Sequence, residues 1–433
     1  MRPQSESPAP ASPPSRSARI PRRYVVVALY FIATMLCYVD RVSISVAIIP
    51  LARRFDFNSG AQGLILSAFF WGYLLTQLAG GWMADRFGGR RVLGAGVAIW
   101  SLATLLTPAA ASISFAILFA IRIVLGLGEG VNFPAIHSLT ARWMLASERA
   151  RALSLNFSGM YLGTVLALLA SPAIIAAFGW PALFYISGAI GLVWVIAWML
   201  TAADRPEDSR HISSAELQAI TASRNALPRA GRVPWAKIVR EKAVWAIVLA
   251  HFCSNFGFNI LLLWLPTYLH HSFGVTVARV GIYSIVPWIA TFVVVNSGGW
   301  IADAMRLRGV SVGATRKLMQ SCAFGIGALP LLAAPAAHSP ASAIALLTVS
   351  AAANGLGLAA YGINHLDVGP TYAGVLMGIS NTIAAIPGII GVAVTGFIVQ
   401  STGSFAAVFY LIAAIDAVGL VGYLRWASGD RKL

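Results

Sequence analysis

Long apolar stretches joined by short polar connections dominate the chain, and their lengths predict helices that cross a bilayer. A membrane-spanning helix needs about 20 mostly apolar residues. Because no stretch between them has the period-two alternation of a barrel strand, helices are the way to satisfy the backbone in lipid. We predict twelve spans, near residues 24–50, 61–83, 91–110, 113–135, 150–178, 181–202, 243–269, 279–302, 317–336, 340–362, 372–400 and 405–425.

An internal repeat divides these spans into two sets of six. A Gly-Gly-Trp-x-Ala-Asp motif ends the second span at Asp85 and returns half a chain later, where it ends the eighth span at Asp303. An aromatic pattern that begins at Trp180 returns at Phe405. We therefore predict an all-α membrane protein made of two pseudo-symmetric six-helix halves, with substrate near the midplane between them.

Polar segments set the predicted boundaries of these halves. We expect a six-helix bundle over 24–202, a cytoplasmic linker over 203–242, a second bundle over 243–425 and a tail over 426–433. Residues 1–23 are rich in Pro, Ser and Arg and predict a disordered basic tail, with a short targeting segment as the alternative. Within the linker, the pattern Ser213-Ser214-Ala215-Glu216 predicts the start of a short surface helix.

Composition and charge agree with a membrane protein. The chain is 58% hydrophobic and 11% charged, whereas a soluble protein carries roughly 25% charged residues. Most Lys and Arg residues lie in the amino tail, the central linker, the carboxyl tail and the second-to-third, fourth-to-fifth and eighth-to-ninth connections. This asymmetry predicts that both termini and the linker face the cytoplasmic or equivalent side. It explains the net charge of +16 without a nucleic-acid partner.

The connection between spans two and three carries the pattern Gly81-x-x-x-Asp85-Arg86-x-Gly88-x-Arg90-Arg91. This pattern resembles the signature loop of the major facilitator superfamily, which implies the major facilitator fold. We expect Asp85 to pair with Arg groups or a helix end on the neighbouring span. Together with Arg86, Arg90 and the repeated Asp303, it would form a conformational latch.

Ionisable groups inside the spans are the main functional candidates, because burying charge in a membrane is costly. Asp40 and Arg41 lie in span one, and Arg122 and Glu129 lie on one face of span four. The two guanidinium groups suit an oxyanion, and the two carboxylates suit a proton or Na⁺. The alternative is a permanent structural network of Arg–carboxylate pairs.

Other polar residues in the spans are assigned more local roles. We expect Tyr73, Asn255 and Asn381 to contact substrate, and most remaining polar groups to join helices by hydrogen bonds. Because the last span is usually peripheral, Asp416 is expected to be structural.

Cysteines and prolines add no chemistry of their own. Cys37, Cys253 and Cys322 lack metal or disulfide spacing, so we expect small buried hydrophobes and no metal site. Prolines inside the second-half spans should kink or interrupt the helices at Pro266, Pro287 and Pro387.

Longer strings resemble one family of anion carriers. Residues 69–77, 122–134 and 364–382 are similar to the second span, the fourth span and the tenth-to-eleventh connection of the anion:cation symporter family. Trp288 and Arg316 look closest to its plant chloroplast branch, which includes sodium-dependent phosphate carriers. The resemblance implies that Arg41 and Arg122 handle the anion. It implies that the coupling cation is handled by Asp40 and Glu129.

The resulting prediction is a secondary active transporter of a small anion, first of all inorganic phosphate, coupled to Na⁺ or H⁺. The alternative within transport is an H⁺-coupled carrier of an organic anion such as a sugar acid, a dicarboxylate or ascorbate. The family's vesicular glutamate branch has His where Leu66 stands and Arg where Ser254 stands, which argues against glutamate loading. A non-transporting receptor on a carrier fold is the alternative from another class.

An enzyme is not expected, because the sequence has no nucleophile–base pair, metal cluster or phosphate loop. We expect no cofactor beyond the coupling ion, and a monomer in the bilayer. The membrane would be the plasma membrane in a bacterium and a plastid membrane in a photosynthetic eukaryote.

Overall fold

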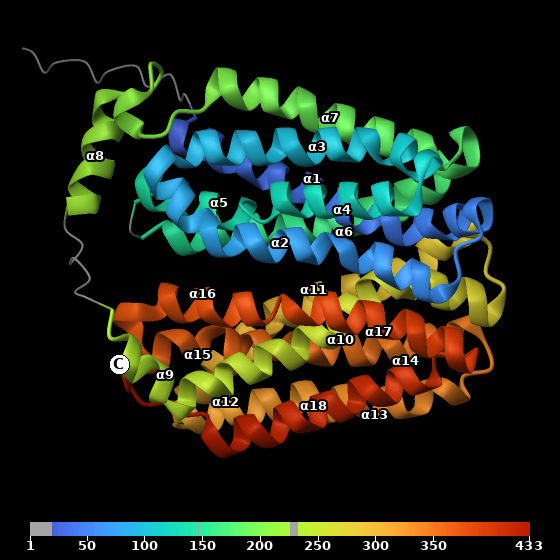
Figure 1. Ribbon diagram of the computed structural model, residues 1–433. Helices are drawn as coiled ribbons and strands as arrows, with labels where there is room; N and C mark the ends of the chain where they lie inside the picture. The colour runs from blue at the N-terminus through green and yellow to red at the C-terminus, as the bar shows by residue number, and fades with distance from the viewer. Residues whose placement is uncertain (1–19, 146, 226–232) are drawn as a thin grey trace, which may run out of the picture.

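Two bundles of roughly antiparallel helices lie side by side (Figure 1). The computed structural model describes residues 20–145, 147–225 and 233–433, and no β-strand occurs within these ranges. The first half contains α1 (Arg22–Phe55), α2 (Ser59–Phe87), α3 (Gly89–Ile113), α4 (Phe115–Glu129), α5 (Asn132–Trp143), α6 (Arg149–Phe178) and α7 (Trp180–Thr201).

The second half has more breaks in its helices. It contains α10 (Lys242–Phe273), α11 (Val277–Leu307), α12 (Val312–Ser321), η2 (Cys322–Ile326), α13 (Gly327–Ala333), η3 (Ala334–Ala336), α14 (Pro340–Gly355), η4 (Leu356–Ala359), α15 (Tyr361–Val368), η5 (Pro370–Tyr372), α16 (Ala373–Ile383), α17 (Ile386–Thr402) and α18 (Ala406–Trp426). Of the short turns, η2 is a π-helix.

The segment between the halves carries η1 (Pro206–Asp208), α8 (Ser214–Asn225) and α9 (Trp235–Arg240). The helix predicted from the Ser213–Glu216 pattern is confirmed as α8, and the amide of Glu216 donates to Ser213 Oγ at 3.2 Å. Most of the predicted disordered tail, residues 1–19, lies outside the described residues. Its last two residues are helical, because α1 already begins at Arg22.

The predicted twelve spans are confirmed. Eleven helical stretches in the described ranges are long and apolar enough to cross a membrane, and α2, bent by 50° between Gln77 and Ala79, makes the twelfth. Several helices continue past their predicted ends; α1, predicted to end near residue 50, runs to Phe55. The predicted ends mark where the apolar residues stop, at the edge of the hydrocarbon layer. The helical hydrogen bonds can continue beyond that edge until a capping residue ends the helix. For α1 that residue is Asp56, in the left-handed conformation.

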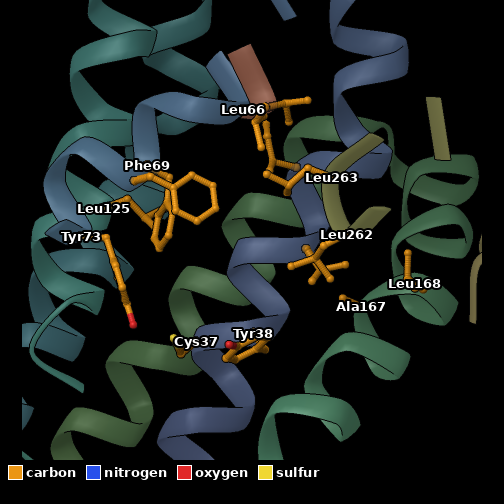
Figure 2. Packing of buried hydrophobic residues seen from close by; sticks show 14 of the residues in the cluster. Cys37, Tyr38, Leu66, Phe69, Tyr73, Leu125, Ala167, Leu168, Leu262 and Leu263 are labelled. Carbon is orange, nitrogen blue, oxygen red and sulfur yellow. The ribbon is translucent and has the colours of Figure 1, made fainter. Parts of the chain in front are cut away.

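Large apolar side chains remain exposed on the outer faces of the bundle. Such faces would aggregate in water but are solvated by lipid. They include Leu102, Leu106, Ile190, Val193, Ile196, Leu200, Ile282, Val293, Trp300, Leu329, Val418 and Val421. The inside is equally apolar, and one cluster of buried residues contains side chains from both halves, such as Leu66 and Leu263 (Figure 2).

The two halves touch tightly at one end only. We call the end that carries α8, α9 and the carboxyl terminus the linker end, and the other the opposite end (Figure 1). At the opposite end the amide of Gly60 donates to Gln400 Oε1 at 3.1 Å, and Arg53 contacts His270. These two contacts fasten the halves to each other at the opposite end.

Glycine lets the helices of the two halves approach at the opposite end. A Cβ atom on Gly63 of α2 would lie 3.1 Å from the Cα of Gly396 of α17, and one on Gly281 of α11 would lie 1.9 Å from the backbone oxygen of Leu168 on α6. Small residues permit such close backbone contacts in membrane bundles. The opposite end is therefore closed by direct helix packing.

Besides the bend of α2 and the π-turn η2 of span nine, spans four, ten and eleven are interrupted near mid-length. Span four breaks after α4 at Gly130, span ten breaks at η4 and Ala360, and span eleven breaks between α16 and α17. Pro387 lies in the first turn of α17, directly after its break, as predicted. In contrast, α10 and α11 continue through Pro266 and Pro287 without interruption. Discontinuous helices supply free backbone groups at the depth where carriers bind their substrates.

Candidate anion site

A cavity of about 410 Å³ lies between the two halves. Along α6 its wall begins at Leu153, one turn from the linker end, and goes no further than Tyr161. Because the opposite end is packed shut, the cavity opens toward the linker end. Its wall is formed by residues of α1, α2, α5 and α6 from the first half, and of α10, α11, α14, η4, α15, α16 and α18 from the second.

The first-half wall carries one guanidinium group, that of Arg41 on α1. Its Nε and Nη2 donate to Oε2 of Glu129 at 3.2 and 2.9 Å. Its Cζ lies 4.6, 4.5 and 4.9 Å from the ring centres of Tyr38, Phe69 and Tyr73. Such rings attract the cation electrostatically and hold its plane. Arg41 therefore reaches the cavity as a fixed, aromatic-caged group.

Glu129 lies behind Arg41 and is completely buried. Besides Arg41, the thiol of Cys37 donates to Oε2 at 3.0 Å, while Oε1 has no hydrogen-bond partner in the part of the chain described. Figure 2 shows Cys37 beside Tyr38, with the hydroxyl of Tyr73 directed to the same region. Cys37 was expected to be only a small buried hydrophobe; it is buried, but it also holds the carboxylate.

Arg122 and Asp40 are buried and are not part of the cavity wall. Arg122 interacts electrostatically with Glu129 and Asp40, but its Nε and Nη1 make no hydrogen bond to any described residue. The sequence had predicted two guanidinium groups at the cavity, but the described wall contains only that of Arg41. Arg41 borders the cavity, and the role of Arg122 in anion binding stays a prediction.

The second-half wall combines apolar side chains with several amides and hydroxyl groups. Asn255 and Asn381 border the cavity, where we expected them. Tyr361 donates to Ser254 Oγ at 3.3 Å, and Ser254 bonds Asn354. These bonds join α15, α10 and α14 around the break in span ten. The sequence contained these residues, but only the fold brings them together.

Two histidines extend this wall into the protein. The ring of His251 stacks on Tyr361 with centres 5.0 Å apart, and its Nδ1 lies 3.3 Å from Ser380 Oγ. On the other side, His365 Nε2 lies 2.8 Å from the same oxygen. Thus a His–Ser–His chain, spread over α10, α16 and α15, backs the second-half wall.

Asp416 contradicts its expected peripheral position. It lies on α18, is 1% exposed and belongs to the cavity wall. Span twelve packs against span seven, α10, which is itself a principal wall of the cavity. One face of the last span therefore reaches the centre of the protein.

The predicted latch residues are distributed over several contacts. Asp85 is largely exposed; its Oδ1 accepts from Ser138 Oγ at 2.9 Å and lies 3.5 Å from Nη2 of Arg142, both on α5. Arg86 and Asp303 are exposed and make no ion pair with another described residue. Span two is thus tied to span four by Asp85 alone among the predicted residues.

Arg90 contacts a residue that sequence reasoning missed. The amide of Arg90 donates to Oδ1 of Asp204 at 2.8 Å, so that carboxylate caps the start of α3. Gly88 has a φ of 93°, and a Cβ there would lie 2.3 Å from the same oxygen. The glycine of the signature loop is required by this cap. The signal for Asp204 was its place directly after span six, but its partner is far away in the sequence.

The helical halves, the signature loop and the central cavity agree with the result of sequence comparison. The family model of the Major Facilitator Superfamily matches residues 30–392. The chain belongs to the major facilitator superfamily. Its structure resembles that of a bacterial homologue of the human lysosomal transporter Spinster, with a TM-score of 0.74 and 18% identity over 95% of this chain and 97% of that one.

Curated relatives place this major facilitator protein among the chloroplast-type anion transporters. An ascorbate transporter of Arabidopsis thaliana chloroplasts is 40% identical over 96% of this chain and 76% of its own length. A chloroplast protein of the same plant, named sodium-dependent phosphate transport protein 1, is 40% identical over 95% and 80%. The predicted family is therefore confirmed, and the chain is a multi-pass membrane protein of a transporter family.

Proposed function

We propose that this protein is a secondary transporter of a small organic anion, which binds to Arg41 in the central cavity. The carrying observation is the composition of the cavity wall. It has one caged guanidinium group, from the first half, while aromatic, aliphatic and amide side chains form most of the remainder, with Asp416 as the carboxyl group of the second half. A carboxylate suits one guanidinium group through paired hydrogen bonds. The rest of an organic anion suits an aromatic cavity, whose volume of about 410 Å³ is within the usual range for small ligands.

Inorganic phosphate, which the sequence favoured, is the second candidate. It is supported by the relative named as a sodium-dependent phosphate transport protein. A phosphate dianion, however, must replace its hydration on all sides, and burying it requires several charged or hydrogen-bonding donors. Arg41 already shares its Nε and Nη2 with Glu129. The geometry therefore favours an anion with one charged end and a less polar body, as in ascorbate or a sugar acid.

Coupling to a cation follows from the same pair of residues. In the structure Glu129 neutralises Arg41, and its Oε1 has no partner among the described residues. A proton on Glu129 would weaken its hold on Arg41 and free the guanidinium group for the substrate. Substrate and proton would then bind cooperatively, which is the requirement for symport. Asp40, buried on the same helix, remains the second candidate for the coupling cation, and no cofactor is part of the proposal.

Uptake into proteoliposomes tests the proposal. Labelled ascorbate, a hexuronate, a dicarboxylate and phosphate would each be offered with an imposed pH gradient or an imposed Na⁺ gradient. We expect accumulation of an organic anion driven by the pH gradient and competition by related carboxylates. Phosphate uptake alone, driven by Na⁺, would replace the proposal with the second candidate. Binding without uptake or exchange of any anion would identify a receptor.

A further inference from the structure

A carboxyl group of the second half borders the cavity, far in sequence from the Arg41–Glu129 pair of the first half. Asp416 on α18 is 1% exposed, and its Oδ1 is buried without a hydrogen-bond partner. No hydrogen bond or ion pair reaches either of its oxygens from the residues that the structure describes. An ionised carboxylate in such a place is costly. A bound cation, with H⁺ the smallest, removes that cost.

The elements packed against α18 offer no fixed positive charge to Asp416. The helices and turns α13, η3 and α17 carry no titratable side chain, and η2 carries only Cys322. Of the two basic residues of α12, Arg316 is bound to Asp367 at 2.8 Å, and Lys317 makes no ion pair with a described residue.

The titratable groups of α10 likewise leave Asp416 without a partner. They are Lys242 at the linker end, His251, Cys253, Tyr268, His270 and His271. Of these, Cys253 interacts electrostatically with Asp416. A thiol cannot neutralise a carboxylate, so the packing around α18 supplies no counter-ion.

Helix packing does not require a carboxyl group at this position. The sequence spacing that relates Trp180 to Phe405 also relates Gly191 of α7 to Asp416. In the first half the equivalent position is a glycine at which α7 packs closely against α3. A Cβ atom on Gly191 would lie 2.1 Å from Ser101 Oγ. In the second half the neighbouring span contains the π-turn η2, and π-turns occur often at functional sites. The second half has thus made room for a polar group.

We propose that Asp416 is a proton-binding site of the second half, loaded from the cavity and separate from the Arg41–Glu129 pair. A lone carboxyl without further ligands suits H⁺, whereas a metal cation requires several oxygen ligands. No group of three or more His, Cys, Asp or Glu side chains is assembled anywhere in the described residues. As a coupling site Asp416 rests on the proposed transport function, but as a proton site it can be tested without any substrate.

Carbodiimide labelling tests the proton site directly. Dicyclohexylcarbodiimide adds to protonated carboxyl groups in apolar surroundings, and peptide mass mapping locates each adduct. In purified full-length protein in lipid nanodiscs, Asp416 should be labelled, and each pH unit above its midpoint should lower the protonated fraction about tenfold. The exposed Asp430 is the matched control and should stay unlabelled. Absence of label at Asp416 at every pH, or its protection by Na⁺ at constant pH, would overturn the proposal.

Transport by two variants tests the coupling role. With ascorbate or phosphate as the probe, Asp416→Asn should lower pH-driven accumulation about tenfold per unit of imposed gradient, while counterflow exchange continues. Asp416→Glu should keep both the label and the pH-driven accumulation. Unchanged pH-driven accumulation in Asp416→Asn would remove the coupling role. A wild-type protein that is labelled at Asp416 but carries no anion would instead refute the proposed transport function.

Discussion

The two walls of the cavity are built by halves of the same fold, yet their chemistry differs. The first-half wall presents the caged Arg41, with three more ionisable groups buried behind it. The second-half wall presents amides and hydroxyls with a His–Ser–His chain behind them, and Asp416 is its carboxyl group. Duplication thus fixed the helices, while the polar residues inside them diverged. Under the proposed function, the first-half wall would recognise the charge of the anion and the second-half wall would orient the neutral part of the substrate.

Removal of Arg41 should break this division most severely. Arg41→Ala deletes the only guanidinium group on the described wall and should cost about 2–3 kcal/mol of anion binding, or roughly 30- to 150-fold in apparent affinity. Uptake at a series of anion concentrations measures this. Because the variant leaves Glu129 buried without its partner, Arg41→Ala combined with Glu129→Gln is the control for folding. Arg122→Ala should have the smaller effect on affinity; a larger one would move the anion site to Arg122.

Replacement of Glu129 should separate binding from coupling. In Glu129→Gln, Arg41 no longer faces a carboxylate that takes up a proton. A gradient of one pH unit supplies about 1.4 kcal/mol per proton, so accumulation should fall about tenfold per unit while counterflow exchange persists. Accumulation and exchange are both measured with labelled anion in the same proteoliposomes. Accumulation that follows the pH gradient as in the wild type would assign coupling to Asp40 or Asp416 instead.

A change in the second-half wall should be milder. Tyr361→Phe removes the hydroxyl that donates to Ser254 at 3.3 Å but keeps the ring against His251. One neutral hydrogen bond is worth about 1 kcal/mol, so apparent affinity for an organic anion should fall about fivefold. Competition assays with anions that differ in one hydroxyl group would show the change. Affinity loss as large as that of Arg41→Ala would contradict the division between the walls.

The smallest effect is expected at the linker end of the first half. Glu148, between spans four and five, accepts hydrogen bonds from Arg23, which hold the pKa of its carboxyl group below the usual range. A lowered pKa stabilises the fold above the unfolded value of about 4.3, and this gain disappears as pH falls through the folded value. Glu148→Gln should therefore cost about 0.5–1 kcal/mol at neutral pH.

The measurement is the thermal midpoint of the detergent-solubilised protein at neutral and at acidic pH. The variant should melt about 1–2 °C lower than the wild type at neutral pH, and the two should converge in acid. Because neither Glu148 nor Arg23 belongs to the cavity wall, anion affinity should stay unchanged. A persistent difference in acid would mean that Glu148 contributes through packing and not through charge.

The two halves also differ in the contacts that hold their linker ends. In the first half, Glu216 of α8 accepts from the amides of Arg22 and Arg23 at 3.0 Å each, so the start of α1 is capped by the linker helix. In the second half, the amide of Leu433 donates to the backbone oxygen of Val368 at 3.0 Å. Each half is thus closed by its own following segment. A side-chain carboxylate does this in the first half, and backbone bonds together with the side chain of Asn364, which donates to the backbone oxygen of Ser428 at 2.9 Å, do it in the second.

The sequence by itself determined the number of spans, their division into halves and the family. Apolar stretches of membrane length allow one backbone solution, the helix, and a repeated motif such as that of Asp85 and Asp303 marks duplication. It also identified the costly charges, because any ionisable residue within a span stands out against an apolar background. These are local properties that can be read along a single chain.

Tertiary structure alone decided which of those charges meet the cavity. Arg41 and Arg122 are both single arginines within apolar spans, but in the structure Arg41 borders the cavity, whereas Arg122 is buried outside its wall. Asp416 reaches the centre because α18 packs on α10, and Cys37 bonds Glu129 because α1 meets α4. The orientation of a helix and the choice of its neighbours depend on contacts between residues far apart in the chain. The hydrophobic pattern along one segment carries no information about those contacts.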